Sequence, residues 1–176
     1  MTRVIRKSRA RSSREAANLL SAIFAAELIR PSSCLWLVSP WISDIALIDN
    51  TTNGFEAVRG FGSRPIRLSE VLVTLAGLGT AVVVGTTSDV TNNAFRQRAR
   101  RAFDDRGLGD RLLIDVDISG ELHEKAVTGD DFVVSGSMNL TNNGVFVREE
   151  FIEFRTDEEF VARSRMDAYD RFGGVL

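Results

Sequence analysis

Three short apolar runs, separated by segments with helical periodicity, constrain the fold of this chain more than any other feature. The runs cover residues 34–38, 81–85 and 112–116, and their length and composition are typical of buried strands. Helical patterns cover residues 12–29, 69–78, 92–106 and 157–172. Strands that alternate with helices predict an α/β sandwich, and a strand hairpin precedes the last helix.

The composition fits one domain with a full core. The chain has 176 residues, of which 44% are hydrophobic, as in ordinary soluble proteins. We expect a single domain over residues 12–176, preceded by a basic arm at residues 1–11. Such an arm either contacts nucleic acid or is a solvated tail. The net charge of −2 gives no overall attraction to nucleic acid, so binding would depend on local patches.

The apolar segments and the cysteine content indicate where the protein resides. No apolar run is long enough to cross a membrane, and no clear cleavage site follows the apolar stretch at residues 19–29. Cys34 is the only cysteine, so the chain forms no internal disulfide, and its apolar neighbours suggest a core thiol in a reducing compartment. We therefore expect a cytoplasmic protein without membrane association.

Polar residues at fixed spacings in the last third of the chain suit phosphodiester chemistry. His123, the only histidine, is followed by Lys125 and Asp130, and then by Ser137 and Asn139 in a G-S-x-N sequence. Phosphodiester cleavage needs a nucleophile, a proton donor for the leaving oxygen, and positive charge around the phosphoryl oxygens. Imidazole suits the first two roles because its ordinary pKa lies near neutrality.

The spacing also predicts how these groups are arranged. If the segment around residues 122–126 is a strand, the side chains of His123 and Lys125 share one face. The ammonium then lies beside the imidazole, where a phosphate oxygen can rest. Asp130 falls in the turn before the next strand, where its carboxylate is expected to orient the loop. The small and neutral polar residues at 136–139 suit a phosphate cradle.

The H-x-K-x4-D and G-S-x-N sequences together resemble the signature of the phospholipase D superfamily. The apolar strand followed by Ser39-Pro40-Trp41 is similar to the first strand and loop of that family, so the resemblance runs from Ser39 to Glu150. It implies a phospholipase D-like α-β-α sandwich with a mixed central sheet. The family's site uses two histidines of this kind. A single motif, as in the small bacterial nuclease branch, therefore implies a homodimer with an isologous interface.

The resemblance also implies a mechanism and roles for the residues. His123 of one subunit attacks phosphorus and forms a phosphohistidine, and His123 of the other protonates the leaving oxygen. Lys125, Ser137 and Asn139 from both chains hold the phosphoryl oxygens, so neither a metal nor another cofactor is required. The lack of a histidine or cysteine cluster in the sequence agrees with this expectation.

In the family, a glutamate further along the chain hydrogen-bonds a catalytic histidine. Glu149 and Glu150 are both candidates for this acid, and we prefer Glu150 because it directly precedes the apolar strand residues Phe151 and Ile152. Family members often have Asn two residues before the acid, whereas this chain has Arg148 there. The identity of the acid therefore stays open at this point.

Additional residues are candidates for binding substrate. Trp41 can stack on a base, although a tryptophan after a buried strand more often supplies core or interface area. One face of the helix expected over residues 92–106 carries Arg96, Arg98, Arg100 and Arg101. Arg96 and Arg100 are the candidates for contacting phosphates, and the alternative is a simply solvated charged face.

These observations favour a metal-independent phosphodiesterase, and within that class a nuclease acting on DNA ahead of RNA. The first alternative is a non-catalytic nucleic-acid-binding or assembly subunit, and the second is a lipid phosphodiesterase. The N-terminal half resembles a phospholipase D-like protein of bacterial gene clusters that insert 7-deazapurines into DNA. That resemblance implies a role in DNA modification or defence, with partner proteins from such a system.

Overall fold

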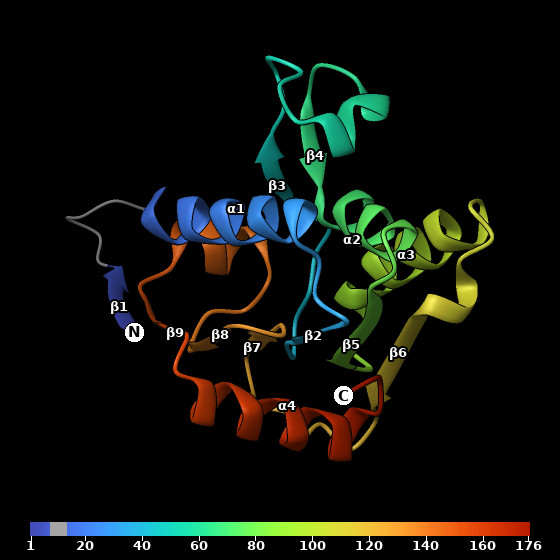
Figure 1. Cartoon of the computed structure of the whole chain (residues 1–176). Helices are drawn as coiled ribbons and strands as arrows, with labels where there is room; N and C mark the ends of the chain where they lie inside the picture. Colours follow the sequence, from blue (N-terminus) through green and yellow to red (C-terminus); the bar gives the residue numbers. More distant parts are fainter. Residues whose placement is uncertain (8–13) are drawn as a thin grey trace.

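The computed structural model describes residues 1–7 and 14–176, which form a mixed sheet of seven strands with helices on both faces (Figure 1). The strands of this sheet are β1 (Thr2–Lys7), β2 (Cys34–Val38), β5 (Ala81–Thr87), β6 (Leu112–Asp117), β7 (Ala126–Thr128), β8 (Val133–Gly136) and β9 (Glu150–Arg155). The helices are α1 (Arg14–Ile29), α2 (Leu68–Gly77), α3 (Asn93–Asp104) and α4 (Glu158–Phe172). A separate pair of strands, β3 (Ala46–Asp49) and β4 (Pro65–Arg67), forms a small second sheet.

The strand order is β1-β9-β8-β7-β2-β5-β6, and the sheet has a parallel half and an antiparallel half. Strands β2, β5 and β6 are parallel, whereas β7, β8, β9 and β1 continue the sheet in antiparallel pairs. In the observed register, Val38 pairs with Ala126, Ala126 with Ser135, and Gly136 with Ile152. The ends of β2, β5 and β8 and the starts of β7 and β9 therefore lie along one edge, called the site edge below.

The helices form two layers around the sheet (Figure 1). Helices α1, α2 and α3 cover one face and contribute to the larger core cluster, while α4 covers the other. Strand β2 joins the two layers because successive side chains point to opposite faces. Leu35 and Leu37 belong to the larger cluster, and Trp36 packs with Ala168 and Phe172 of α4. The predicted α-β-α sandwich with a mixed sheet is thus confirmed.

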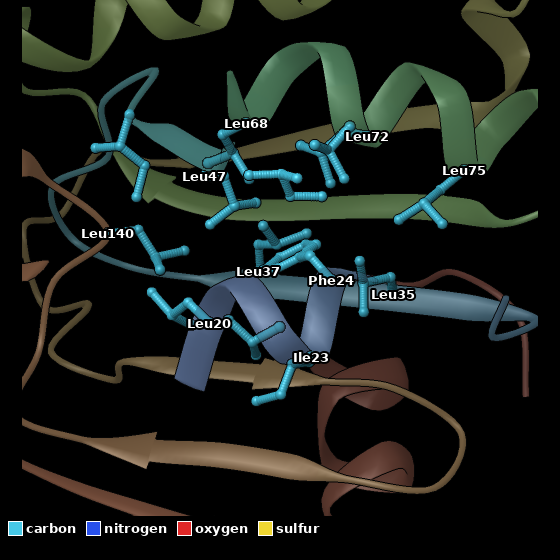
Figure 2. Packing of buried hydrophobic residues seen from close by; sticks show 14 of the residues in the cluster. Leu20, Ile23, Phe24, Leu35, Leu37, Leu47, Leu68, Leu72, Leu75 and Leu140 are labelled. Carbon is cyan, nitrogen blue, oxygen red and sulfur yellow. The ribbon is translucent and has the colours of Figure 1, made fainter. Parts of the chain in front are cut away.

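Leucines from α1 and α2, together with Ile23 and Phe24 of α1, pack against β2 (Figure 2). Phe24 of α1, Leu37 of β2 and Leu72 of α2 are each fully buried. Each such side chain contributes roughly 1.5–3 kcal/mol by leaving water. This packing holds β2 in place, and it therefore also positions the polar residues at the end of that strand.

The N-terminal segment differs from the expected arm. Residues 2–7 form β1, which pairs with β9 along its whole length, and Ile5 is buried. The pairing satisfies backbone groups on the outer side of β9. The basic residues of the segment did not indicate that it would form a strand. The rest of the expected arm, residues 8–11, and the first two residues of the helix expected over residues 12–29 lie outside the described residues.

The Gly-, Asn- and Thr-rich composition of residues 49–66 predicts a loop, but this segment contains ordered elements. A 3-10 helix covers Glu56–Phe61, and β4 then pairs with β3 in a hairpin that projects beyond α1 and α2 (Figure 1). Val58 and Ile66 are fully buried, which supplies the apolar contacts that a free loop would lack. The four predicted helices, in contrast, occur close to their expected bounds.

Candidate active site

The motif residues from the last third of the chain gather at the site edge. His123 and Lys125 directly precede β7, Ser137 and Asn139 follow β8, and Glu150 is the first residue of β9. Backbone hydrogen bonds hold these ends together. The Gly136 amide donates to the Lys125 carbonyl at 3.3 Å, and the Ser137 amide donates to the Phe151 carbonyl at 2.9 Å.

The segment carrying His123 is not a strand, contrary to expectation. Strand β2 ends at Val38, the partner of Ala126, so residues before Ala126 find no partner on β2. The Asp117 carboxylate instead accepts the backbone amide of Leu122 at 2.8 Å. Leu122 is buried against α4, and Glu124 pairs with Arg171 of that helix at 3.5 Å. Contacts with β6 and α4 therefore position His123.

Asp117 is the polar anchor of this segment. Its carboxylate also accepts the Ser119 hydroxyl at 2.6 Å and the Ser119 amide at 2.9 Å. The hydrogen bonds from the Ser119 side chain and from the Leu122 backbone lower the pKa of Asp117 below its ordinary value. The carboxylate is thus ionised near neutral pH and holds the turn that leads to His123.

His123 and Lys125 are in contact at the site edge. His123 is exposed, Lys125 is half-buried, and the ammonium of Lys125 donates to the backbone carbonyl of His123 at 2.5 Å. The ammonium is therefore held at the backbone of His123, where its charge can attract a phosphoryl oxygen.

Ser137 connects the end of β8 to the start of β9. Its hydroxyl donates to Glu150 Oε2 at 2.5 Å and accepts the Phe151 amide at 2.9 Å. Gly136 makes this closeness achievable, because a Cβ at that position would lie 2.1 Å from the Phe151 carbonyl oxygen, and its φ of 146° disfavours other residues. Glu150 therefore has a serine as its partner here, whereas the resemblance implies a histidine.

Asn139 is held near the end of β2 by Ser39, which sequence reasoning did not single out as a site residue. Ser39 is fully buried, and its hydroxyl lies 2.7 Å from the Trp41 carbonyl and 3.3 Å from Asn139 Oδ1. The same oxygen accepts the Leu140 amide at 3.1 Å. The single proton of Ser39 is shared between the Trp41 carbonyl and Asn139 Oδ1, and the side-chain NH2 of Asn139 stays able to donate to another group. The only sequence signal for Ser39 was its place in the S-P-W loop.

Asp130 lies at the other end of β7 from Lys125. Its carboxylate accepts the Ser33 amide at 2.7 Å and the Ser33 hydroxyl at 2.8 Å, and it pairs with Arg165 of α4 at 3.0 Å. The Asp130 amide in turn donates to Ser32 Oγ at 2.9 Å. These contacts fasten the turn between β7 and β8 to the start of β2, which is an orienting role distant from the site edge.

The candidate substrate-binding residues lie in different parts of the structure. Trp41 is 43% exposed and its indole N–H donates to Asp89 at 3.1 Å. Arg96 is hydrogen-bonded to Asn93 of its own helix, and Arg100 is exposed on α3. Trp41 lines a hollow in the protein surface beside Asn139, whereas neither arginine does.

Two further observations concern metal-binding groups and membrane-spanning helices. Over residues 1–7 and 14–176, no three histidine, cysteine, aspartate or glutamate side chains are grouped so that they could hold a metal ion. Among the described helices, none has the length and apolar character needed to cross a bilayer.

Comparisons with known proteins identify the fold. No family model and no curated protein matches the sequence. NucT from Helicobacter pylori, however, aligns over 99% of this chain and 99% of its own, with a TM-score of 0.61 and 12% identity. Nuc from Salmonella typhimurium, a phospholipase D family member, aligns over 97% and 92%, with a TM-score of 0.56 and 13% identity.

TrmBL2, an archaeal chromatin protein with a novel mode of DNA binding, aligns over 99% of this chain and 54% of its own, with a TM-score of 0.54 and 11% identity. The resemblance to the phospholipase D superfamily is thus confirmed at the level of the fold: the chain has the phospholipase D fold.

Proposed function

We propose that this chain is a metal-independent phosphodiesterase that cleaves DNA at a site shared by two identical subunits. The observation that carries the proposal is the gathering of His123, Lys125, Ser137, Asn139 and Glu150 at one edge of a sheet with the fold of Nuc. Such a set supplies a nucleophile, a cation and neutral hydrogen-bond donors for a phosphodiester.

In the proposed reaction, the imidazole of His123 attacks phosphorus as the bond to the leaving oxygen breaks. The protonated His123 of the second subunit gives its proton to that oxygen. The second histidine then takes a proton from water, which attacks phosphorus and breaks the P–N bond. Lys125 neutralises charge on the phosphoryl oxygens, and the amide of Asn139 donates to them.

The homodimer in this proposal is supported by two properties of His123. It is the only histidine in the chain, and it is exposed rather than enclosed by its own subunit. A mechanism with one histidine as nucleophile and another as acid therefore needs a second copy. The role in DNA modification or defence and the cytoplasmic location remain predictions from the sequence.

The test is cleavage of labelled single- and double-stranded DNA in EDTA by the wild type, His123→Ala and Glu121→Ala. Glu121 is an exposed residue of the same segment, so its variant is the matched control. We expect cleavage by the wild type and the control only. Equal cleavage by His123→Ala would exclude the mechanism.

A second experiment tests the shared site. Excess His123→Ala protein should inhibit the wild type after the subunits are mixed and allowed to exchange, because heterodimers lack one histidine. Undiminished activity would point to a monomeric enzyme. A protein that binds DNA but never cleaves it would favour the alternative of a binding subunit, for which TrmBL2 provides a DNA-binding example with this fold.

A further inference from the structure

A hollow of about 370 Å³ lies beside Asn139 on the site edge, lined by residues that include Trp41, Thr91, Asn143 and Arg148. Its volume is within the range of about 300–1,000 Å³ that is common for small-ligand sites. Because Asn139 also belongs to the proposed phosphate site, the hollow is placed to hold the part of a substrate next to the reacting phosphate.

Trp41 forms a rigid wall of this hollow. Asn92, which is fully buried, donates to the Pro40 carbonyl at 2.9 Å and accepts the Ile42 amide at 2.8 Å. These bonds fix the backbone on both sides of Trp41, and Asp89 fixes the indole through its N–H. An exposed aromatic ring held in place in this way loses little freedom when a flat ligand stacks on it.

The wall of Asn143 and Arg148 carries polar groups. Asn143 is the first residue of a π-helical turn (Asn143–Val147) and Arg148 follows that turn, and the Arg148 amide donates to the Asn143 carbonyl at 2.7 Å. The Asn143 amide can both donate and accept, and the guanidinium of Arg148 suits a phosphate. None of the side chains that line the hollow is a carboxylate.

One aromatic face, several neutral hydrogen-bonding groups and one cation match the chemistry of a nucleotide. A nucleobase can stack on Trp41 and form hydrogen bonds through its edge with the side-chain amides, while Arg148 contacts the adjoining phosphate. A fatty acyl chain would need a lining of aliphatic side chains, whereas Trp41 is the only apolar residue that lines this hollow.

We propose that this hollow binds an unpaired nucleobase beside the phosphate that is cleaved, and that the substrate is single-stranded or locally unpaired nucleic acid. The base must be unpaired because a duplex covers both of its faces and occupies its pairing edge. The inference rests on the proposed function only in taking the neighbouring phosphate as the reacting one.

The experiment measures binding with His123→Ala protein, so that no strand is cleaved. The probes are a labelled oligothymidylate, a strand of equal length with abasic sites throughout, and a duplex. We expect the abasic strand and the duplex to bind roughly five- to hundredfold more weakly than the oligothymidylate, the factor that one base stacked on an aromatic ring contributes.

Variants at Trp41 in the same background show where the base binds. Trp41→Ala should lower affinity for oligothymidylate by a similar factor and leave affinity for the abasic strand nearly the same, while Trp41→Phe should retain most of the affinity. Equal weakening of both strands by Trp41→Ala would overturn the proposal. So would loss of the dimer in that variant, since Trp41 would then belong to a subunit interface.

Tryptophan fluorescence gives a second readout. The chain has two tryptophans, and Trp36 is fully buried whereas Trp41 is exposed. Oligothymidylate should therefore quench Trp41 in the His123→Ala protein, and Trp41→Phe in this background should abolish the quenching. No quenching at saturation would contradict stacking.

The possible results separate this inference from the proposed function. Wild-type cleavage of DNA together with equal binding of the abasic strand would refute the base site alone. Base-dependent binding by a protein that does not cleave DNA would refute the nuclease and leave the base site in place.

Discussion

Ser137 Oγ lies 2.5 Å from Glu150 Oε2 and accepts the amide of Phe151 at 2.9 Å, so one hydroxyl connects the acid to the backbone of β9. The proton of Ser137 is therefore directed to the carboxylate. Ser137 and Glu150 consequently form one unit at the site edge, and the orientation of either side chain depends on the other.

Substitutions in this unit should be strongly non-additive. Glu150→Gln keeps the shape but weakens a charge-assisted hydrogen bond, which is worth about 1.5–3 kcal/mol, or roughly a 10- to 100-fold loss of cleavage rate. Ser137→Ala should have a similar effect, and the double variant should be little slower than either single one. The measurement is kcat of the three variants on one DNA substrate, and losses that multiply would show that the residues act independently.

Lys125→Ala should lower kcat by about 10²–10³-fold, the usual cost of removing one group that stabilises transition-state charge. The reason is the position of its ammonium beside His123. Lys125→Arg keeps the charge and should restore part of the rate. Single-turnover cleavage by both variants provides the test, and a wild-type rate in Lys125→Ala would show that the phosphate binds elsewhere.

Ser39→Ala should weaken both the fold and the site. The substitution leaves the buried Leu140 amide without its partner, at a cost of about 1–3 kcal/mol. It also removes the contact that orients Asn139. Urea unfolding compared with Ser88→Ala, a substitution at an exposed serine, checks the first effect, and an unchanged midpoint would contradict it.

Much of the fold could be predicted because each central element has a local signal. Leu35, Leu37 and the other apolar residues of the parallel strands form short uninterrupted runs, and the helices have clear periodicity. Strand β1 has no such signal, because its Arg and Lys residues resemble a solvated arm and its order comes from pairing with β9. The β3–β4 hairpin was missed because β4 has a single apolar side chain apart from its proline, Ile66, and so shows no apolar run.

The site residues could be named from spacing, but their partners could not. Ser39 and Asn139 are 100 residues apart, and only the position of β2 in the sheet brings them together. Likewise, the register of β8 against β9 decides that Glu150 meets Ser137. Such contacts depend on tertiary structure, which sequence periodicity does not encode.

Asp130→Ala should destabilise the protein and have little effect on chemistry. The variant loses two hydrogen bonds from Ser33 and the ion pair with Arg165, at a part of the sheet away from His123. Because the Asp130 side chain is partly exposed, the expected loss is about 1–2 kcal/mol. Thermal unfolding and activity per folded molecule check this prediction. A large fall in activity at unchanged stability would instead indicate a direct catalytic role.

The Asp117 carboxylate should make the stability of the protein fall in acid. Its pKa is lowered in the folded state by the Ser119 hydroxyl and the Leu122 amide, so folding favours the ionised form. The stabilisation is present above the unfolded pKa of about 3.9 and is lost as the pH falls through the lower folded value. Asp117→Asn does not titrate, and its side chain has a single acceptor oxygen, so it cannot accept from both Ser119 and Leu122.

Urea unfolding of the wild type and Asp117→Asn between about pH 2 and pH 6 tests this linkage. The wild type should be the more stable protein at pH 6, and its advantage should shrink as the pH falls below about 4. All other carboxylates are common to both proteins, so the difference isolates Asp117. A constant difference across the range would show that the charge of Asp117 does not hold the segment that carries His123.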